Sequence, residues 1–242
     1  MVRSMVPTVI RKEFREYRRN RFIVFTMAAM PVVVLLILVG ETFALPERIP
    51  LAALRRPVGE ALLFLQLIPV MLPTTIAAYA VIGEREQGTL EPVLTTPVTD
   101  RALLAGKAIA AVLPTVAISW LLYAVYVGLA QLFAPAVVVS QIWTLDQVVA
   151  MAVLTPALAA FAILVGILIS LRSTDFRVAQ QLAVLASLPV IGLVALVTFR
   201  VIRPSAALYA AAAGAVGLMA AGCWRLATGL FNRERLLTRF GS

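Results

Sequence analysis

Six apolar stretches, each about as long as a membrane-spanning helix, recur along the 242-residue chain and limit what it can fold into. An α-helix rises about 1.5 Å per residue, so roughly 20 apolar residues are needed to cross a hydrocarbon core of ~30 Å. Transmembrane β-strands would instead need alternating apolar and polar residues, a pattern that these stretches lack. The sequence therefore predicts an all-α integral membrane protein whose single transmembrane domain covers 1–242. The predicted transmembrane helices are 22–43, 61–82, 104–132, 148–171, 178–199 and 206–230.

The composition agrees with a membrane protein: 62% of the residues are hydrophobic, 14% are charged, and the mean hydropathy is +0.97. These values lie far outside the range of soluble domains. The segments between the apolar stretches are short, which leaves no room for a soluble catalytic or ligand-binding domain. We expect any such activity to come from a partner protein.

The positions of Lys and Arg predict the orientation, because these residues are retained on the cytoplasmic side of a membrane. If the N-terminus is inside, 16 of the 21 Lys and Arg residues fall on the inner side. We therefore expect a multi-pass protein of the cytoplasmic membrane with both termini in the cytoplasm. The net charge of +9 is concentrated on that side, where anionic lipids attract it, so anionic lipids of the inner leaflet are expected partners and nucleic acid is not.

A basic segment precedes the first apolar stretch. Its apolar residues Val6, Ile10, Phe14 and Tyr17 are spaced three and four apart, with Lys and Arg around them. This spacing predicts an amphipathic elbow helix over 7–21 that lies in the membrane interface, and it places Lys12 and Glu16 as an i,i+4 pair. The alternative is a basic membrane anchor with no further role.

The residues needed for catalysis or ion coupling are scarce. The chain has no His, its one Cys lies inside an apolar stretch, and Gly106-Lys107 lacks the rest of a phosphate-binding loop. We therefore expect no enzymatic activity, no metal and no cofactor bound by this chain, with any ATP and Mg held by a partner ATPase. Ionisable residues are also nearly absent from the middle of the stretches, which disfavours an ion-coupled carrier. That carrier and a membrane scaffold without ATP coupling remain as alternatives.

Polar residues beside prolines indicate a possible substrate path. Pro69 and Pro73 fall in the second stretch, and each removes a backbone hydrogen bond from its helix. Together with polar residues of the fifth stretch, their neighbours are the candidates for the path: Gln66, Thr74, Thr75, Gln180 and Gln181. The alternative is that these side chains only form hydrogen bonds to neighbouring helices.

One polar segment, GEREQGTLEPVLTTPVTD at 83–100, separates the second and third stretches. Gly88 and Pro97 delimit a predicted short helix of about two turns, and Thr99 is expected to cap the next helix. Leu90, Val93 and Leu94 give this short helix an apolar face, while Glu84, Glu86 and Glu91 add negative charge to a basic surface. The segment is expected to dock on a soluble partner. A solvated loop is the alternative.

The longer run GEREQGTLEPVLTTPVTDRALLAGK resembles the cytoplasmic coupling segment of ABC exporter permeases of the ABC-2 type. The likeness consists of an acidic stretch, Gly-Thr-Leu-Glu, a Thr-Pro turn and a Gly-Lys pair, and it lies between the second and third helices, as in that family. IRKEFREYRRNRF is similar to the family's elbow helix, and LVGILISLRSTDFRVAQQLAVLASLP resembles the stretch around its fourth and fifth helices.

The resemblance implies a half-transporter that exports a substrate as a dimer, with a second permease copy or a paralogue and with two separate ATPase subunits. The coupling segment would be 84–98, with coupling residues Glu84, Glu86, Gly88, Thr89, Leu90, Glu91, Leu94 and Pro97, of which Leu94 is included for its place on the apolar face. The short external segments, 44–60 and 200–205, depart from family members with large external parts. This argues against polysaccharide export and leaves metabolite, drug, lipid and ion export or a maturation role open.

Overall fold

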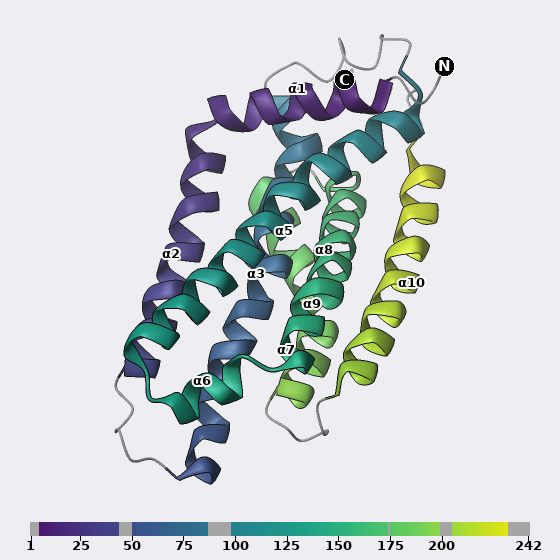
Figure 1. The fold of residues 1–242 in the computed structure, drawn as a ribbon. Coiled ribbons are helices and arrows are strands. Elements are labelled where there is room, and N and C mark those ends of the chain that lie inside the picture. Colours follow the sequence, from purple (N-terminus) through teal and green to yellow (C-terminus); the bar gives the residue numbers. More distant parts are fainter. Residues whose placement is uncertain (1–4, 44–49, 87–97, 174, 199–204, 232–242) are drawn as a thin grey trace.

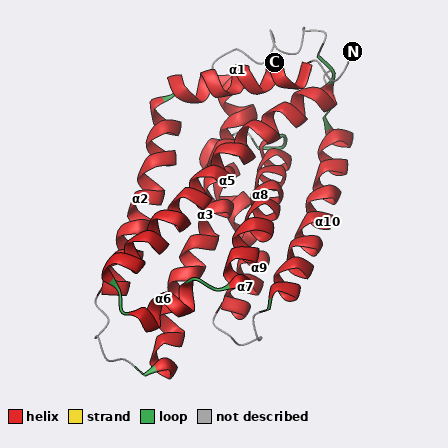
Figure 2. Ribbon diagram, viewed as in Figure 1, coloured by secondary structure: helices red, strands yellow, loops and turns green. Residues whose placement is uncertain are grey.

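The computed structural model describes residues 5–43, 50–86, 98–173, 175–198 and 205–231. In this part of the chain every regular element is a helix (Figures 1 and 2). The helices are α1 (Met5–Arg19), α2 (Arg21–Phe43), α3 (Leu51–Glu86), α5 (Asp100–Phe133), α6 (Ala136–Ile142), α7 (Leu145–Val149), a π-helical turn (Ala150–Leu154), α8 (Thr155–Ser170), α9 (Phe176–Thr198) and α10 (Ala206–Leu230).

Six helical spans in the described residues are long and apolar enough to cross a membrane, which confirms the predicted all-α membrane fold. They lie side by side in a bundle, and α1 lies across one end of it (Figure 1). The spans are Ile23–Phe43, Pro57–Ala77, Asp100–Phe133, Leu145–Ser170, Phe176–Leu196 and Ala206–Leu230.

The second long helix begins earlier than its apolar stretch. It starts at Leu51 rather than at residue 61, so much of the expected external segment 44–60 is helical. Leu54 and Val58 are buried against the core, and this packing extends the helix beyond the apolar run. Pro69 and Pro73 both lie inside α3 and do not end it.

The fourth crossing contains an irregularity that the apolar pattern does not reveal. Pro156 has no N–H, so the α-helical hydrogen bond to the carbonyl of residue 152 cannot form. The chain adopts a π-helical turn just before it, in which the Thr155 N–H reaches the Ala150 carbonyl. The Met151 carbonyl, which would accept from Thr155 in an α-helix, instead accepts from the Trp120 indole Nε1 of α5 at 2.8 Å.

The interior of the bundle is formed mainly by α3 and α8. In the most apolar part of each span, 67% of the α3 residues and 61% of the α7–α8 residues are buried, against 22% for α2, 28% for α9 and 22% for α10. The two central helices approach closely at Gly166, where an added Cβ would lie 2.5 Å from the Ala77 Cβ. The other helices surround this pair and leave much of their apolar surface uncovered.

Candidate functional site

The predicted coupling segment falls largely outside the described residues. Glu84 and Glu86 lie in the last turn of α3, whereas Gly88, Thr89, Leu90, Glu91, Leu94 and Pro97 belong to the undescribed residues 87–97. The helix that follows begins as expected: the Thr99 side chain accepts a hydrogen bond from the Ala102 N–H at 3.3 Å, with Asp100 in the first turn. The start of α5 lies at the α1 end of the bundle (Figure 1).

Helix α1 packs on the first turns of α5 at very close range. Val9 and Tyr17 are buried on its inner face. A Cβ at Gly106 of α5 would lie 2.5 Å from Val9 Cγ1 and 2.6 Å from Val9 Cβ, so only glycine leaves room for α1. Close packing against α1 therefore explains why the first residue of the Gly-Lys pair is glycine.

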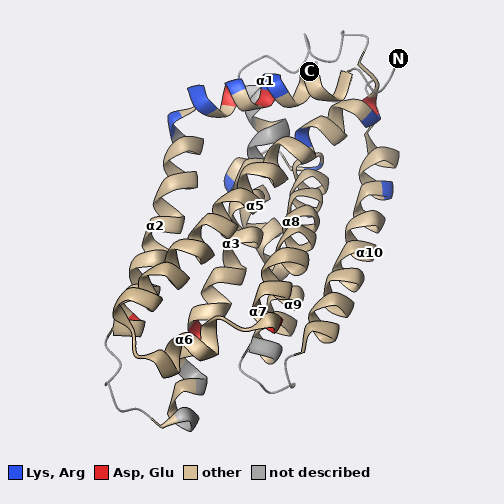
Figure 3. Cartoon of the chain, viewed as in Figure 1, with Lys and Arg blue, Asp and Glu red and all other residues tan. Residues whose placement is uncertain are grey.

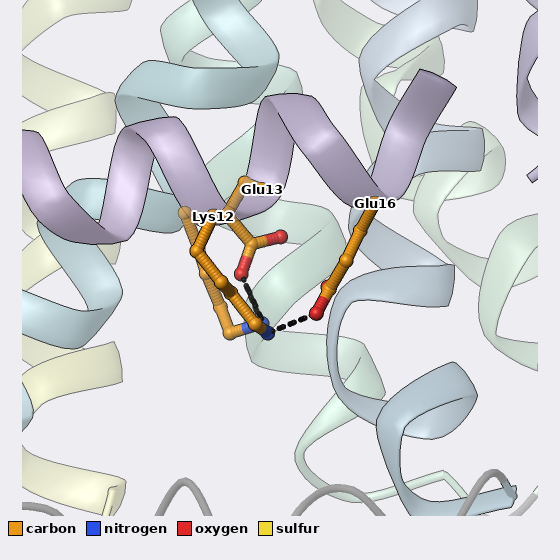
Figure 4. A network of polar contacts seen from close by, with 4 residues as sticks. Lys12, Glu13 and Glu16 are labelled. Carbon is orange, nitrogen blue, oxygen red and sulfur yellow. Dashed lines mark hydrogen bonds and ion pairs between the residues drawn. The ribbon is translucent and has the colours of Figure 1, made fainter. Parts of the chain in front are cut away.

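The lysine of the same pair contacts α1 as well. Lys107 Nζ lies 2.9 Å from Glu13 Oε1, and the two side chains are only 3% and 2% exposed. Lys12 reaches the same carboxylate oxygen at 3.4 Å and also forms the predicted pair with Glu16 at 2.9 Å (Figure 4). One buried carboxylate thus holds two ammonium groups, one from each helix.

Glu13 is not among the site residues predicted from the sequence. A carboxylate in a basic helix suggests a solvated charge, but Val9, Glu13 and Tyr17 are spaced four apart and therefore share one helix face. An acid on the buried face of a helix needs a cationic partner. That spacing was the available signal, although it could not have identified Lys107, which is 94 positions away.

The arginines of α1 face the other way. Figure 3 shows basic residues gathered along α1, in contrast to the mostly uncharged bundle. A shallow cleft of about 470 Å³ is lined by Arg11, Phe14, Arg15, Arg18 and Arg19, and its four arginines are exposed. Since Glu13 and Glu16 pair with lysines, the outer face of α1 is strongly cationic.

Three of the five residues predicted for a substrate path meet in one groove. This groove has a volume of about 380 Å³, with α2 on one side, α9 on the other and α3 between them. Gln180 Nε2 donates to Thr75 Oγ1 at 2.8 Å, and Thr74 Oγ1 donates to the Met71 carbonyl of its own helix at 2.7 Å. The groove is lined by Phe25, Thr26, Ala29, Met30, Met71, Leu72, Thr74, Thr75, Gln180 and Val184.

The other two candidates lie elsewhere. Gln66 is buried beside the π-helical turn, where the Thr155 hydroxyl donates to its Oε1 at 3.5 Å and its Nε2 lies 3.9 Å from Met151 Sδ. Gln181 is exposed and is not among the groove residues. The contacts of Gln66, like the Gln180–Thr75 hydrogen bond between α9 and α3, agree with the alternative that these side chains join neighbouring helices.

A bundle of six helices that can span a membrane, with an amphipathic helix packed across one end, defines a multi-pass membrane protein. Residues 9–190 match the model of the ABC-2 family transporter protein, which is more than half of the chain, so the chain belongs to this family. A comparison with curated protein sequences gives no match. The family supplies the membrane permease of ABC transporters and not the ATPase, and its permeases typically pair with ATP-binding-cassette ATPases. The matched region includes both the groove and the Glu13–Lys107 pair.

Proposed function

We propose that this chain is the permease subunit of an ATP-binding-cassette exporter. It pairs with a second copy or a paralogue and with two separate ATPase subunits that bind ATP and Mg, and it moves a substrate outward across the cytoplasmic membrane. The family match over 9–190 carries this proposal. The scarcity of buried ionisable groups in the middle of the spans supports ATP coupling over ion coupling, because ion-coupled carriers usually depend on such groups.

The groove between α2 and α9 is our candidate for the substrate path. Its polar residues, Thr26, Thr74, Thr75 and Gln180, lie among apolar side chains. Two of the helices that line it, α2 and α9, leave most of their surface uncovered. A second permease subunit facing this side would close the groove into a path between subunits. Gln66 and Gln181 fit the path less well, since one is held in the interior and the other lies outside the groove.

The energy enters through the coupling segment, 84–98, and Leu90 and Glu91 are its central anchors. Docked helices of this length depend on a few central contacts rather than on total area. The arginine face of α1 suits the anionic lipids of the inner leaflet, which supports a cytoplasmic position for this end of the bundle and for both termini.

A double substitution in the segment tests the coupling role. Leu90→Asp charges the apolar face and Glu91→Lys reverses a charge. We expect each substitution to cost about 2 kcal/mol of coupling free energy, so the double variant should lose transport at least roughly thirtyfold. The measurement is ATP-driven transport in proteoliposomes that contain the permease and its ATPase. Asp146→Lys, a charge reversal at the opposite end of the bundle, is the control. A double variant that inserts, assembles and transports at the wild-type rate would show that the segment is a solvated loop.

Two further measurements complete the test. Vesicles that hold this chain alone should show no transport driven by a proton gradient, and transport there would indicate an ion-coupled carrier. Single cysteines at Arg19, Arg56, Thr95 and Arg203 test the orientation. Labelling of Thr95→Cys from outside intact cells contradicts it.

A further inference from the structure

We infer that Glu13 and Lys107 fasten α1 to the start of α5, so that the two move as one body and carry movement of the coupling segment to the α2 wall of the groove. We call α1 together with residues 98–107 the docked unit. The inference rests on the proposed function, because it concerns how force from the ATPase would travel after it reaches the segment.

The Glu13–Lys107 ion pair holds α1 and α5 together strongly because both charges are removed from water. With the side chains 2% and 3% exposed and 2.9 Å apart, each charge compensates the other. Separating the helices would break a buried ion pair, which is far more costly than losing a surface pair. At Gly106 of α5 the two helices are so close that any side chain there would meet Val9 of α1.

The docked unit begins directly after the coupling segment. Thr99 caps α5, and Lys107 lies about two helical turns further on, so continuous helix connects the cap to the ion pair. Val98 also packs against the core. A displacement of the segment therefore reaches Lys107 without passing through a flexible linker.

The other end of the docked unit leads into the groove. Only Asn20 separates α1 from α2, and it is bonded to both: its N–H donates to the Glu16 carbonyl at 3.0 Å, its carbonyl accepts from the Val24 N–H at 3.0 Å, and its Oδ1 accepts from the Ile23 N–H at 3.3 Å. Phe25 and Thr26, in the following turn, line the groove. A tilt of α1 must therefore move this wall.

Distances between spin labels test whether the docked unit is one body. Labels replace the exposed Arg15 of α1 and Arg101 of α5, in a chain that carries Cys223→Ser and is assembled with its ATPase. We expect the Arg15–Arg101 distance to be the same in the nucleotide-free and ATP-trapped states. A second pair, Arg15 and the exposed Arg177 of α9, should change between the states. A changing first distance, or a constant second one, overturns the inference.

Substitutions test whether the Glu13–Lys107 ion pair contributes to the coupling of ATP hydrolysis to transport. Glu13→Gln and Lys107→Met each remove the buried ion pair between α1 and α5. We expect transport per ATP hydrolysed to fall roughly fivefold or more, at the lower end of measured coupling effects. The exchange Glu13→Lys with Lys107→Glu should restore most of this ratio. Glu16→Gln, which removes only the exposed pair with Lys12, is the matched control and should leave the ratio unchanged. Because it is a ratio, this readout does not respond to a lower yield of folded protein.

The outcomes separate this inference from the proposed function. A Glu13→Gln complex that assembles and keeps the wild-type ratio overturns the inference alone, provided that the Leu90→Asp, Glu91→Lys variant loses transport. If that coupling-segment variant also transports normally, the proposed function fails too. Should the single variants not fold, the label distances in the otherwise native protein still decide the inference.

Discussion

The central helices and the outer helices of this bundle use glycine in opposite ways. Gly166 of α8 lies against Ala77 of α3, with no room for even a methyl group between them. The outer helix α10 contains Gly214 and Gly217, around which an added Cβ would meet nothing within 4 Å. Since lipid is as apolar as the helices themselves, close packing of small residues, and not escape from water, holds membrane helices together. The comparison therefore distinguishes glycines that are required for folding from glycines that are not.

The same contrast runs through the burial of whole helices. About two thirds of the residues in the most apolar part of α3 are inside the protein, whereas roughly a quarter of those in the corresponding parts of α2, α9 and α10 are. In water, exposing so much apolar surface would be energetically unfavourable. In a membrane it leaves these helices available to contact lipid or another subunit. The stability of the fold should therefore depend mainly on the central helices, and association with another subunit should depend on the outer helices.

The largest expected effect comes from filling the central contact. Gly166→Leu places four carbons where Ala77 already leaves no space, so we expect a loss of about 3 kcal/mol or more, at the upper limit of overpacking. Thermal unfolding of the detergent-solubilised protein measures it. Gly214→Leu, the same substitution on the open face of α10, should change stability little. Equal losses in the two variants would remove the distinction between centre and periphery.

The contact between α1 and α5 should also lose stability when it is overpacked, but by less than the central contact does. Gly106→Ala introduces a methyl group that meets Val9, and we expect it to cost about 1–3 kcal/mol. Val9→Ala in the same chain removes the opposing methyl groups and should recover part of the loss. A double variant that is no more stable than Gly106→Ala alone would show that the strain is not located between these two residues.

A partly buried hydrogen bond between α5 and the π-helical turn gives the third effect. Trp120→Phe keeps an aromatic ring but removes the donor to the Met151 carbonyl, which the π-helical turn leaves without an α-helical partner. We expect a loss of about 1–2 kcal/mol in thermal unfolding, the usual cost of an unsatisfied buried acceptor. Trp143→Phe is the control, because Trp143 is exposed to a similar degree, 54% against 46% for Trp120, and stacks on Tyr123, a contact that Phe preserves. Similar losses in both would assign the effect to ring size rather than to the hydrogen bond.

The sequence was sufficient for the number of spans, the cap at Thr99 and the Lys12–Glu16 pair, because each depends on local spacing. It was insufficient for the start of α3, the π-helical turn and the Glu13–Lys107 pair. These depend on which distant residue is nearby: Leu54 is helical because the core covers it, and Glu13 is buried because Lys107 meets it.

The candidate path shows the same limit. Polarity within the apolar stretches was enough to select Thr75 and Gln180, which the structure brings within hydrogen-bonding distance. It could not separate them from Gln66, whose partner Thr155 comes from a helix far along the chain. The roles proposed for the coupling segment remain predictions, because its central residues lie outside the described part of the chain.

The smallest effect on stability should come from the periphery, where association is the informative measurement. Phe25 and Leu218 are 68% and 77% exposed, so truncating either to Ala should change unfolding by less than about 0.5 kcal/mol. Phe25, however, lines the groove that we propose a second permease subunit closes, whereas Leu218 lies on α10, outside it. Phe25→Ala should therefore lower the fraction of permease recovered with a second, differently tagged permease subunit, and Leu218→Ala should not. Equal recovery in both variants would mean that α2 does not meet the second subunit through this groove, and that its exposed surface faces lipid as that of α10 does.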